Sequence, residues 1–462
     1  MPLSESPFSC CLLDGLFWLS CVVLFPSYWF IDRLLTCAVG TGAGGSGGAA
    51  WRVLGLVLGV PLFLLLFVLS LPLCLLGLLL WVPLHQVRRP FSYQSHVDPA
   101  DRTLSGERSF IFISANLCLL PDGLARFSNL RHTQRRARAI ARLLCAAQSS
   151  QDVLPMMQEK TPAGLFQVSL DFPPAADFIC LQEVFDGRAS RQLRRCLGAS
   201  YPHILYDVGP SGPRGCGFKF FNSGLFLASR HLPLCAKYYI YPNARGEDAL
   251  ASKGLLCVKV HLGTTEQKQS IVGYLNCTHL HAPESDGAIR CDQMSLILQW
   301  VGDFQAENAQ DGELVAFDVL CGDLNFDNCS SDDCLEQKHK IFSMYSDPCR
   351  DRAGRDRPGA LGTLLRQELL YHEAVNTPAR LKSTLLSESE RRLYVAPPLP
   401  QDDGGDGPWT GRRIDYILYR EADTLLPVAV DKVQFITRLA GLSDHVPVAL
   451  HLSSSLSETT AL

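Results

Sequence analysis

The chain has 462 residues and a formal net charge of -4, with 42 Lys and Arg against 46 Asp and Glu. This length suits one large domain or two ordinary ones. Hydrophobic residues make up 47% of the chain and charged residues 19%, a composition that excludes a disordered protein. The slightly acidic balance gives no basic surface for nonspecific binding to duplex nucleic acid.

The 18 cysteines are scattered along the chain, often inside apolar runs, as at Cys180, Cys257 and Cys321. Cysteines in this setting are typical of small buried hydrophobic residues in a reducing compartment. The sequence contains no C-x-x-C pair, so a zinc ribbon or a thioredoxin-type site has no support. Asn276 and Asn328 match the glycosylation sequon, but we interpret both as chance matches in a domain that faces the cytosol.

Two long apolar segments lie in the N-terminal part of the chain. The first covers residues 15–31, about the minimum length that spans a bilayer, and the second covers residues 53–84. Pro61, Pro72 and Pro83 interrupt the second segment and favour a kink or a break. The sequence predicts a membrane anchor and leaves open whether the second segment is a tilted span or a re-entrant hairpin.

Charged and reactive residues border these segments. Arg88 and Arg89 follow the second segment directly, as expected for an anchor at an anionic, cytoplasmic surface. We therefore expect anionic phospholipids near this pair to tune activity. Candidate palmitoylation sites near the segments are Cys10, Cys11, Cys21 and Cys37.

One soluble domain over residues 91–462 is predicted to follow an anchor over residues 1–90. Apolar spacing of three and four residues predicts helices over residues 133–147 and 291–305. Apolar runs with period-two stretches predict strands over residues 110–117, 178–184, 222–229, 254–262, 270–280, 314–325, 414–419 and 445–452. Several consecutive strands with few helices between them favour an α/β fold of two mixed sheets packed face to face, with helices outside.

Polar residues stand at the ends or borders of these strands. They are Asn116, Glu183, His279, Asp323, Asn325, Asp444 and His445. Each alone is more often a turn residue or a structural histidine. Their recurrence at the same kind of position predicts a functional site at the rim of a rigid sheet.

The order of these motifs, N…QE…H…GDxN…SDH, resembles the endonuclease/exonuclease/phosphatase superfamily of metal-dependent phosphoesterases. The words NSGLFLAS, NCTHLHA and GDLNFDN are similar to those of neutral sphingomyelinases of the membrane-anchored vertebrate group. The resemblance covers residues 114–450 and departs at Leu324, where many relatives carry Phe. The modest stretch between Asn116 and Glu183 resembles the shorter, mitochondria-associated type.

This resemblance implies a four-layered α/β sandwich and the hydrolysis of sphingomyelin to ceramide and phosphocholine, assisted by Mg²⁺ with Mn²⁺ as a substitute. It implies that Glu183 binds the metal, with the side-chain oxygen of Asn116 beside it, in keeping with the preference of Mg²⁺ for oxygen ligands. His445 is the general base, since an unperturbed imidazole pKa of about 6.5 suits activation of water. Asp444 either orients the site or reaches a second metal.

Asp323 and Asn325 stand two apart on a predicted strand, so we expect them to share a face. There Asp323 would orient the water or the base, and Asn325 would donate a hydrogen bond to the developing phosphorane charge. His279 is the candidate proton donor to the ceramide oxygen, or a group that stabilises the phosphate. His281 lies two residues on and competes for that role, since the period of two along a strand would put both histidines on one face, although the TH motif favours His279.

Two further segments resemble family features. Asp248 and Lys253, in EDALASKG, resemble a switch loop in which an Asp and a Lys re-pair to gate the site, and the alternative is a solvated loop with an incidental charge pair. Arg413 and Asp415, in WTGRRIDY, are expected to brace the site, as in the whole superfamily.

Alternatives to a sphingomyelinase stay open on the sequence alone. A nuclease is disfavoured by the hydrophobic anchor and negative charge, a phosphoinositide phosphatase by the lack of a basic cluster beside the motifs, and a silent lipid-binding scaffold by the competent residues at every matched position. The expected partners are membrane sphingomyelin and anionic phospholipids, without nucleic acid, and the sequence does not indicate an oligomeric state. The expected location is a mitochondrial or endoplasmic reticulum membrane, with Golgi or plasma membrane left open, and the catalytic domain facing the cytosol.

Overall fold

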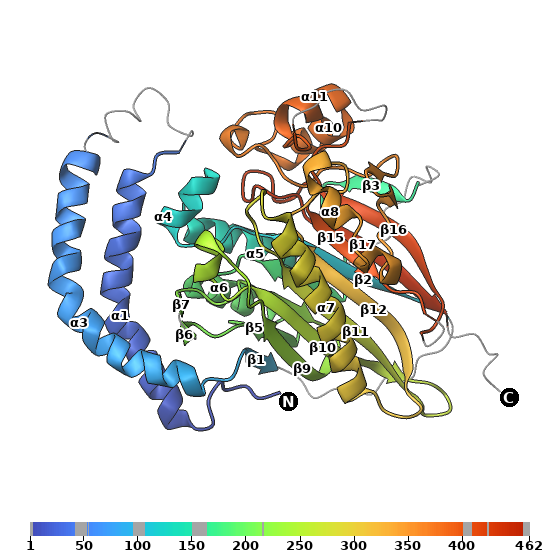
Figure 1. Ribbon diagram of the computed structural model, residues 1–462, viewed down its shortest axis with the longest axis horizontal. Helices are drawn as coiled ribbons and strands as arrows, with labels where there is room; N and C mark the ends of the chain where they lie inside the picture. Colours follow the sequence, from blue (N-terminus) through green and yellow to red (C-terminus); the bar gives the residue numbers. More distant parts are fainter. Residues whose placement is uncertain are drawn as a thin grey trace.

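The computed structural model describes residues 3–41, 53, 55–95, 107–149, 164–214, 217–400, 409–422 and 425–455. Two sheets pack face to face in the main body, and two long helices stand beside it (Figure 1). The larger sheet has eight strands in the order β1-β5-β8-β4-β2-β17-β16-β3, and the smaller has five in the order β15-β12-β11-β10-β9.

The strands of the larger sheet are β1 (Ser92–Ser95), β2 (Glu107–Asn116), β3 (Phe166–Ser169), β4 (Phe178–Gln182), β5 (His203–Tyr206), β8 (Phe226–Ser229), β16 (Val428–Ile436) and β17 (Val448–Ser455). Those of the smaller sheet are β9 (Leu232–Ile240), β10 (Gly254–Thr264), β11 (Ser270–His279), β12 (Leu314–Asp323) and β15 (Asp415–Tyr419). Two short hairpins are formed by β6 (Gly212–Arg214) with β7 (Gly217–Lys219) and by β13 (Arg350–Arg352) with β14 (Arg355–Asp356). Each sheet is mixed, because β2 and β4 run parallel in the larger and β11 and β12 run parallel in the smaller.

Helices cover the outer faces of both sheets. The helices of the main body are α4 (Asp122–Ala125), α5 (Thr133–Ser149), α6 (Gly187–Leu197), α7 (Gly287–Asn308), α8 (Cys334–Gln337), α9 (Ile341–Met344), α10 (Pro378–Leu386) and α11 (Glu388–Tyr394). Buried side chains of α5 and α6, such as Ile140 and Leu193, pack on the larger sheet, and those of α7, such as Ile297, pack on the smaller. A third core lies between the sheets and includes Phe112 and Phe317. The result is the four-layered α/β sandwich that the resemblance implied.

The predicted strands and helices are confirmed, with boundaries that shift by a few residues. In the two sheets, the prediction omitted β1, β3 and β5, each only four residues long, and also β9 and β16, in which polar residues such as Lys237 and Asp431 interrupt the apolar pattern. Asn276 and Asn328 are buried and hydrogen-bonded to Asp318 and Asp356, respectively, which confirms that their sequons are chance matches. Every cysteine in the described residues is free.

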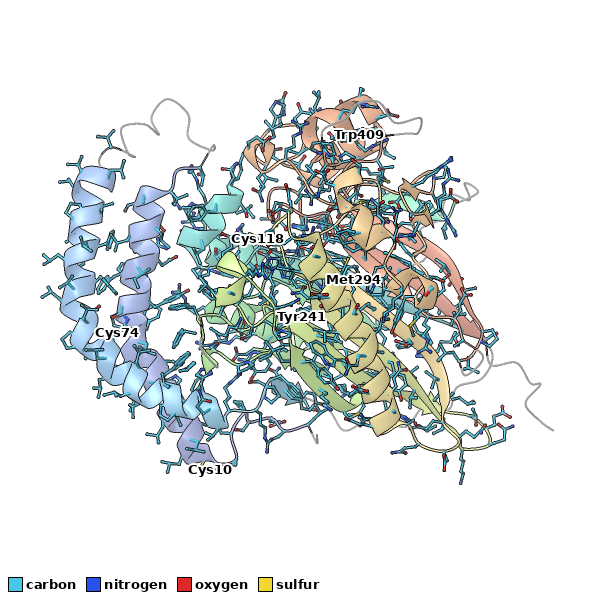
Figure 2. The ribbon with its side chains drawn as sticks, viewed as in Figure 1. Cys10, Cys74, Cys118, Tyr241, Met294 and Trp409 are labelled. Carbon is cyan, nitrogen blue, oxygen red and sulfur yellow. The ribbon has the colours of Figure 1, made fainter. Side chains whose placement is uncertain are left out.

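The anchor consists of α1 (Cys11–Ala38) and α3 (Val60–Val87). A short π-helical turn, Gly55–Gly59, directly precedes α3. The two helices pack along each other, and the Oγ atoms of Ser27 and Ser70 are 2.7 Å apart. Pro72 lies inside α3 without breaking it, and the helix bends along its length (Figure 1). Many apolar side chains of α3 are exposed, among them Leu65, Leu69, Leu75 and Leu79, and side chains project from the helix on the side away from the main body (Figure 2).

The first anchor helix also contacts the main body through polar groups. Asp32 is buried and accepts a hydrogen bond from the backbone N–H of Gly123, at 2.7 Å. The hydroxyl of Tyr28 donates to Asp186, the residue that caps α6, at 3.0 Å. These contacts hold α1 between α3 and the main body.

Arg88 is a correction to the sequence analysis. It is only 6% exposed, and its guanidinium pairs with Asp207 and donates to the Asp207 carbonyl oxygen at 3.0 Å. Arg88 therefore fastens the end of α3 to the main body. Its partner, Asp207, is distant in sequence, so the local sequence did not reveal the pair. It does not lie free for lipid headgroups.

Candidate active site

The predicted site residues converge where the carboxyl ends of two parallel strand pairs meet. Asn116 ends β2 beside β4 in the larger sheet, and Glu183 follows β4 directly. His279 and Asp323 end β11 and β12 in the smaller sheet and are direct register partners. Face-to-face packing of the sheets brings these four side chains together at one edge.

Asn116 links the two sheets. Its side-chain nitrogen donates to Glu183 Oε1 at 2.8 Å and to Asp323 Oδ2 at 3.0 Å. Its side-chain oxygen accepts a hydrogen bond from the backbone N–H of Cys118 at 3.0 Å. In this geometry Asn116 holds two carboxylates in place, and its predicted role as a metal ligand stays a prediction.

Glu183 sits in an unusual backbone conformation, with φ at +58°. The left-handed region is costly for a residue with a side chain, and such strain is often found at functional sites. Gly224 permits the close approach here: at φ +73°, a Cβ on it would lie 3.0 Å from Glu183 Cα and 2.9 Å from the Phe185 ring. The strand end is thus fixed by its surroundings.

His445 and Asp415 form a buried pair that crosses between the sheets. His445 Nδ1 lies 2.8 Å from Asp415 Oδ2, which leaves the other ring nitrogen, Nε2, 3.9 Å from Asp323 Oδ2. Burial alone lowers the pKa of His445, but the charges of Asp415 and Asp323 raise it overall well above its usual value. Sequence reasoning placed Asp415 only as a bracing residue, and the signal for its closer role was its position in the RRIDY segment.

Asp444 lies beside this pair and is 3% exposed. Its Oδ2 accepts a hydrogen bond from Gln367 at 2.9 Å. Its Oδ1 is buried without a hydrogen-bond partner among the described residues. Asp415 Oδ1 is likewise buried without a hydrogen-bond partner among the described residues, so two carboxylate oxygens of the site are available to bind a ligand.

His279 contacts Lys253, a residue that the sequence assigned to a separate loop. Lys253 Nζ is 3.0 Å from His279 Nε2 and 2.9 Å from Asp248 Oδ2, so the predicted Asp–Lys pair is formed and touches the site. Burial and the nearby ammonium lower the pKa of His279 well below its usual value. Burial tends to raise the pKa of Asp248, but Lys253 and a hydrogen bond from His281 hold it well below its usual range.

Two expectations about side-chain direction are wrong. Asn325 does not continue the strand of Asp323, because β12 ends at Asp323 and Asn325 turns to φ +55°. It still borders the site: its backbone N–H donates to Asp323 Oδ1 at 2.9 Å, and its side-chain nitrogen donates to Leu280 O at 3.0 Å. His281 does not share the face of His279, because β11 ends at His279, and the ring of His281 instead pairs with Asp286 at 2.8 Å.

The donor set fits a divalent cation. Ligand atoms of Glu183, His279 and Asp323 all lie within 4.8 Å of one another. Burial and the charge of Asp444 raise the pKa of Glu183, and burial with the charge of Asp415 raises the pKa of Asp323 to about 7. Such crowding of buried carboxylates is what a bound cation relieves.

Comparison with known proteins identifies the family. The profile of the Endonuclease/Exonuclease/phosphatase family matches residues 126–445, and the profile of the neutral sphingomyelinase N-terminal transmembrane region matches residues 12–87. Sphingomyelin phosphodiesterase 5 of Danio rerio is 42% identical over 99% of both chains. The chain belongs to the neutral sphingomyelinase family. The mouse sphingomyelin phosphodiesterase 5 is 46% identical over 97% of this chain and 94% of the relative.

Within the neutral sphingomyelinases, the chain is nearer to the shorter type. Human sphingomyelin phosphodiesterase 3 is 33% identical over the full length of both chains, below the values for the two relatives above. The matched N-terminal profile also assigns the apolar helices to the membrane, so this neutral sphingomyelinase is membrane-anchored. Among solved structures, a beta toxin from Staphylococcus aureus with bound magnesium ions covers 74% of this chain and 99% of its own, at 16% identity and a TM-score of 0.43.

Proposed function

We propose that this neutral sphingomyelinase hydrolyses membrane sphingomyelin, adding water across the bond between phosphorus and the ceramide oxygen to give ceramide and phosphocholine. The observation that carries the proposal is the His445–Asp415 pair, whose free ring nitrogen is directed at Asp323. The carboxylate of Glu183 lies beside it, held by the amide of Asn116. The family of the chain, whose curated relatives are named sphingomyelin phosphodiesterases, supplies the substrate.

In this proposal the neutral form of His445 takes the proton from the attacking water. A cation bound at the carboxylates would favour that form, because it would offset the charges of Asp415 and Asp323 that raise the pKa of His445. Asp415 accepts the Nδ1 hydrogen, which fixes the ring and leaves Nε2 to receive the proton. The same carboxylate stabilises the imidazolium that forms. Asp323, which lies 3.9 Å from Nε2, orients the water, and Asp444 adds to the negative field around the base.

Glu183 would hold Mg²⁺, with the second lone pair of the Asn116 oxygen beside it. Bound there, Mg²⁺ or its substitute Mn²⁺ would polarise a phosphoryl oxygen and stabilise the leaving alkoxide. Asn116 keeps Glu183 and Asp323 at hydrogen-bond distance from one amide group, so it positions both carboxylates.

Asn325 and His279 act on the phosphate and the leaving group. The bond from Asn325 to Leu280 uses one of its two amide hydrogens, and the other stabilises charge on the phosphorane. His279 donates a proton to the ceramide oxygen or a hydrogen bond to the phosphate. As Lys253 occupies its Nε2, that donation requires Lys253 to move away.

The Asp248–Lys253 pair is therefore proposed as a switch. Lys253 is 4% exposed and shares its ammonium between Asp248, His279 and the carbonyl oxygen of Leu280. Re-pairing that moves Lys253 away from His279 frees the histidine for catalysis. The geometry favours this over a solvated loop, because both members of the pair are buried.

We propose residues 1–90 as the anchor and residues 91–462 as the catalytic domain, and we propose that the anchor is a re-entrant hairpin. Asp32 and Tyr28 of α1 bind α4 and the cap of α6, so a perpendicular crossing would draw charged parts of the main body into the bilayer. The apolar outer side of α3 would then lie in the membrane. The catalytic domain would face the cytosol, on a mitochondrial or endoplasmic reticulum membrane, with Golgi or plasma membrane as alternatives.

Anionic phospholipids are proposed as activators, at a different place from the one the sequence suggested. A hollow of about 570 Å³ on the surface is lined by Gln94 and by Arg191, Arg194 and Arg195 of α6. Arg191 and Arg195 are exposed, and Gln94 lies in β1, shortly after α3. A cluster of this charge next to an anchor suits an anionic headgroup.

The test is a substrate panel with the full-length protein in vesicles. Sphingomyelin, phosphatidylcholine and phosphoinositides are presented in otherwise identical vesicles, and released phosphocholine and inorganic phosphate are measured. The proposal expects phosphocholine from sphingomyelin far above the other lipids. Release of inorganic phosphate from phosphoinositides would contradict it, as would no release from correctly folded protein.

A further inference from the structure

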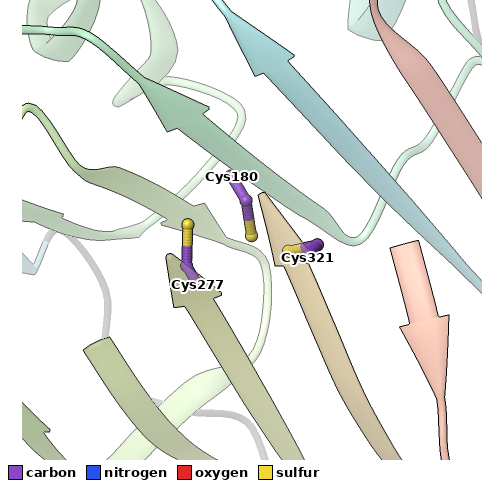
Figure 3. A group of neighbouring side chains, drawn as sticks. All are labelled: Cys180, Cys277 and Cys321. Carbon is purple, nitrogen blue, oxygen red and sulfur yellow. The ribbon is translucent and has the colours of Figure 1, made fainter. Parts of the chain in front are cut away.

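Three buried thiols meet between the two sheets. Cys180 of β4, Cys277 of β11 and Cys321 of β12 turn their sulfur atoms toward one another (Figure 3). The three sulfur atoms all lie within 4.8 Å of one another, and each residue is at most 1% exposed. The cluster joins the larger sheet to two neighbouring strands of the smaller one.

The cluster lies one pleat below the catalytic residues. Cys277 and Cys321 are register partners, as are His279 and Asp323 two residues further along the same strands. Side chains two residues apart on a strand point to the same face, at a spacing of about 7 Å along the strand. The thiols are thus separate from the magnesium ligands but form the floor beneath them.

The dimensions suit a d¹⁰ cation with soft ligands. A zinc–sulfur bond of about 2.3 Å places the sulfur atoms of a three-thiolate site about 4 Å apart. The observed limit of 4.8 Å requires each sulfur to move by less than about 1 Å, which a change of side-chain angle supplies. Thiolate ligands select zinc or copper(I) over the magnesium and calcium ions that prefer oxygen.

Gln182 provides the independent observation. It is fully buried, and its Nε2 lies 3.7 Å from Cys277 Sγ, 3.3 Å from Ser114 Oγ and 3.4 Å from the Cys180 carbonyl oxygen. Its Oε1 has no hydrogen-bond partner in the described parts of the chain. A half-turn of the amide group exchanges nitrogen and oxygen with little change of shape, at the cost of the long hydrogen bonds that Nε2 donates to Ser114 Oγ and to the Cys180 carbonyl oxygen. It would turn the unpartnered oxygen toward the thiols as a fourth, neutral ligand.

We propose that Cys180, Cys277 and Cys321 bind one Zn²⁺ ion, with the amide oxygen of Gln182 completing a tetrahedral site. Binding breaks three S–H bonds, releases three protons to solvent and forms three Zn–S bonds, with no change of oxidation state. The ion ties the two sheets together beneath the active site. This inference does not depend on the substrate of the enzyme.

Other buried cysteines provide the control. Cys257 of β10 is also fully buried, and among the described residues it is not part of a three-ligand cluster. Its thiol packs in the core under α7. Removing its sulfur therefore tests the effect of losing a core cysteine without touching the proposed site.

The first measurement is the zinc content of full-length protein that was produced with zinc and then dialysed against chelator. We expect one tightly held zinc per chain in the wild type and in Cys257→Ala, and loss of that zinc in Cys277→Ala and Cys321→Ala. Equal zinc in all four proteins, or none in the wild type, overturns the proposal.

A second measurement needs no variant and so does not depend on whether a variant folds. Zinc X-ray absorption of the wild type should show three sulfur neighbours at about 2.3 Å and one oxygen or nitrogen neighbour at about 2.0–2.2 Å. A shell of oxygen and nitrogen alone would place the zinc at Glu183, His279 and Asp323, and it would overturn the proposal.

Discussion

The two sheets contribute different parts of the site. The larger sheet and its loops supply Asn116, Glu183, Asp444 and His445, and the smaller sheet supplies His279, Asp323 and Asp415. The contacts that set the geometry cross between them, from Asn116 Nδ2 to Asp323 at 3.0 Å and from His445 Nδ1 to Asp415 at 2.8 Å. Neither sheet holds both members of either contact, so the proposed catalysis depends on the packing of one sheet against the other.

Breaking the histidine link across the sheets should have the largest effect. Asp415→Asn keeps the shape of the side chain but no longer fixes the tautomer of His445, so we expect kcat to fall on the order of 10³- to 10⁴-fold. Phosphocholine release at saturating sphingomyelin measures this. Asp431→Asn, an exposed aspartate on β16, is the matched control and should retain activity. An Asp415→Asn enzyme within threefold of the wild type would contradict the assignment.

Breaking the amide link should have a smaller effect. Asn116→Ala leaves the carboxylates of Glu183 and Asp323 without their shared donor. Loss of such a supporting contact typically weakens metal affinity by about 10- to 100-fold, so the Mg²⁺ concentration for half-maximal activity should rise by that factor. A titration of activity with Mg²⁺ measures this shift. Asn376→Ala is the control, because the side-chain nitrogen of Asn376 donates to the carbonyl oxygen of Tyr371 and not to a residue of the site. An unchanged titration would show that Asn116 does not position these groups.

The sequence predicted most of the framework, for identifiable reasons. Period-two apolar runs located β4, β11 and β12, and the polar residue that ends each run marked Glu183, His279 and Asp323. The family motifs then supplied roles that spacing alone does not give.

What the sequence missed depends on contacts between distant segments. The pairing of His445 with Asp415 joins residues 30 positions apart, and the burial of Arg88 depends on Asp207, 119 positions away. The expectation that Asn325 shares a strand face with Asp323 was wrong, because the backbone adopts a left-handed conformation at Asn325. No local sequence pattern predicts that turn.

Removing Lys253 tests the proposed switch between the resting and the active site. Lys253→Ala deletes the ammonium that occupies His279 Nε2. If anionic lipid activates the enzyme by moving Lys253 away from His279, activity of this variant should respond several-fold less to phosphatidylserine in the vesicles. The ratio of rates with and without that lipid is the readout. Lys237→Ala, at an exposed ion pair with Glu307, is the control. Full activity together with a full lipid response in Lys253→Ala would remove the switch from the account.

The crowded carboxylates predict a pH-dependent effect of Mg²⁺ on stability, the smallest of these effects. The pKa of Asp323 is raised to about 7 in the folded protein, so the unfolded chain loses this proton first. Without metal, the free energy of unfolding therefore falls as the pH rises from the usual carboxyl pKa to about 7. Above about pH 7, Asp323 is ionised in both states and the folded protein carries the full destabilisation. Mg²⁺ should raise Tm more at about pH 8 than at about pH 5. Asp323→Asn should reduce that difference, leaving the part due to Glu183, whose pKa is also raised. An equal Tm rise at both pH values in the wild type would contradict the prediction.

The central claim is that His445, held by the opposite sheet, is the base of a magnesium-dependent sphingomyelinase. Its most direct test is phosphocholine release from sphingomyelin vesicles with Mg²⁺ or EDTA, for the wild type, His445→Ala and His451→Ala. His451 lies in β17 and bonds Gln434, so it is a histidine of the same region outside the site. The account predicts Mg²⁺-dependent release that is retained in His451→Ala and falls by about 10²-fold or more in His445→Ala. Release that persists in EDTA, or that His445→Ala retains, would contradict it.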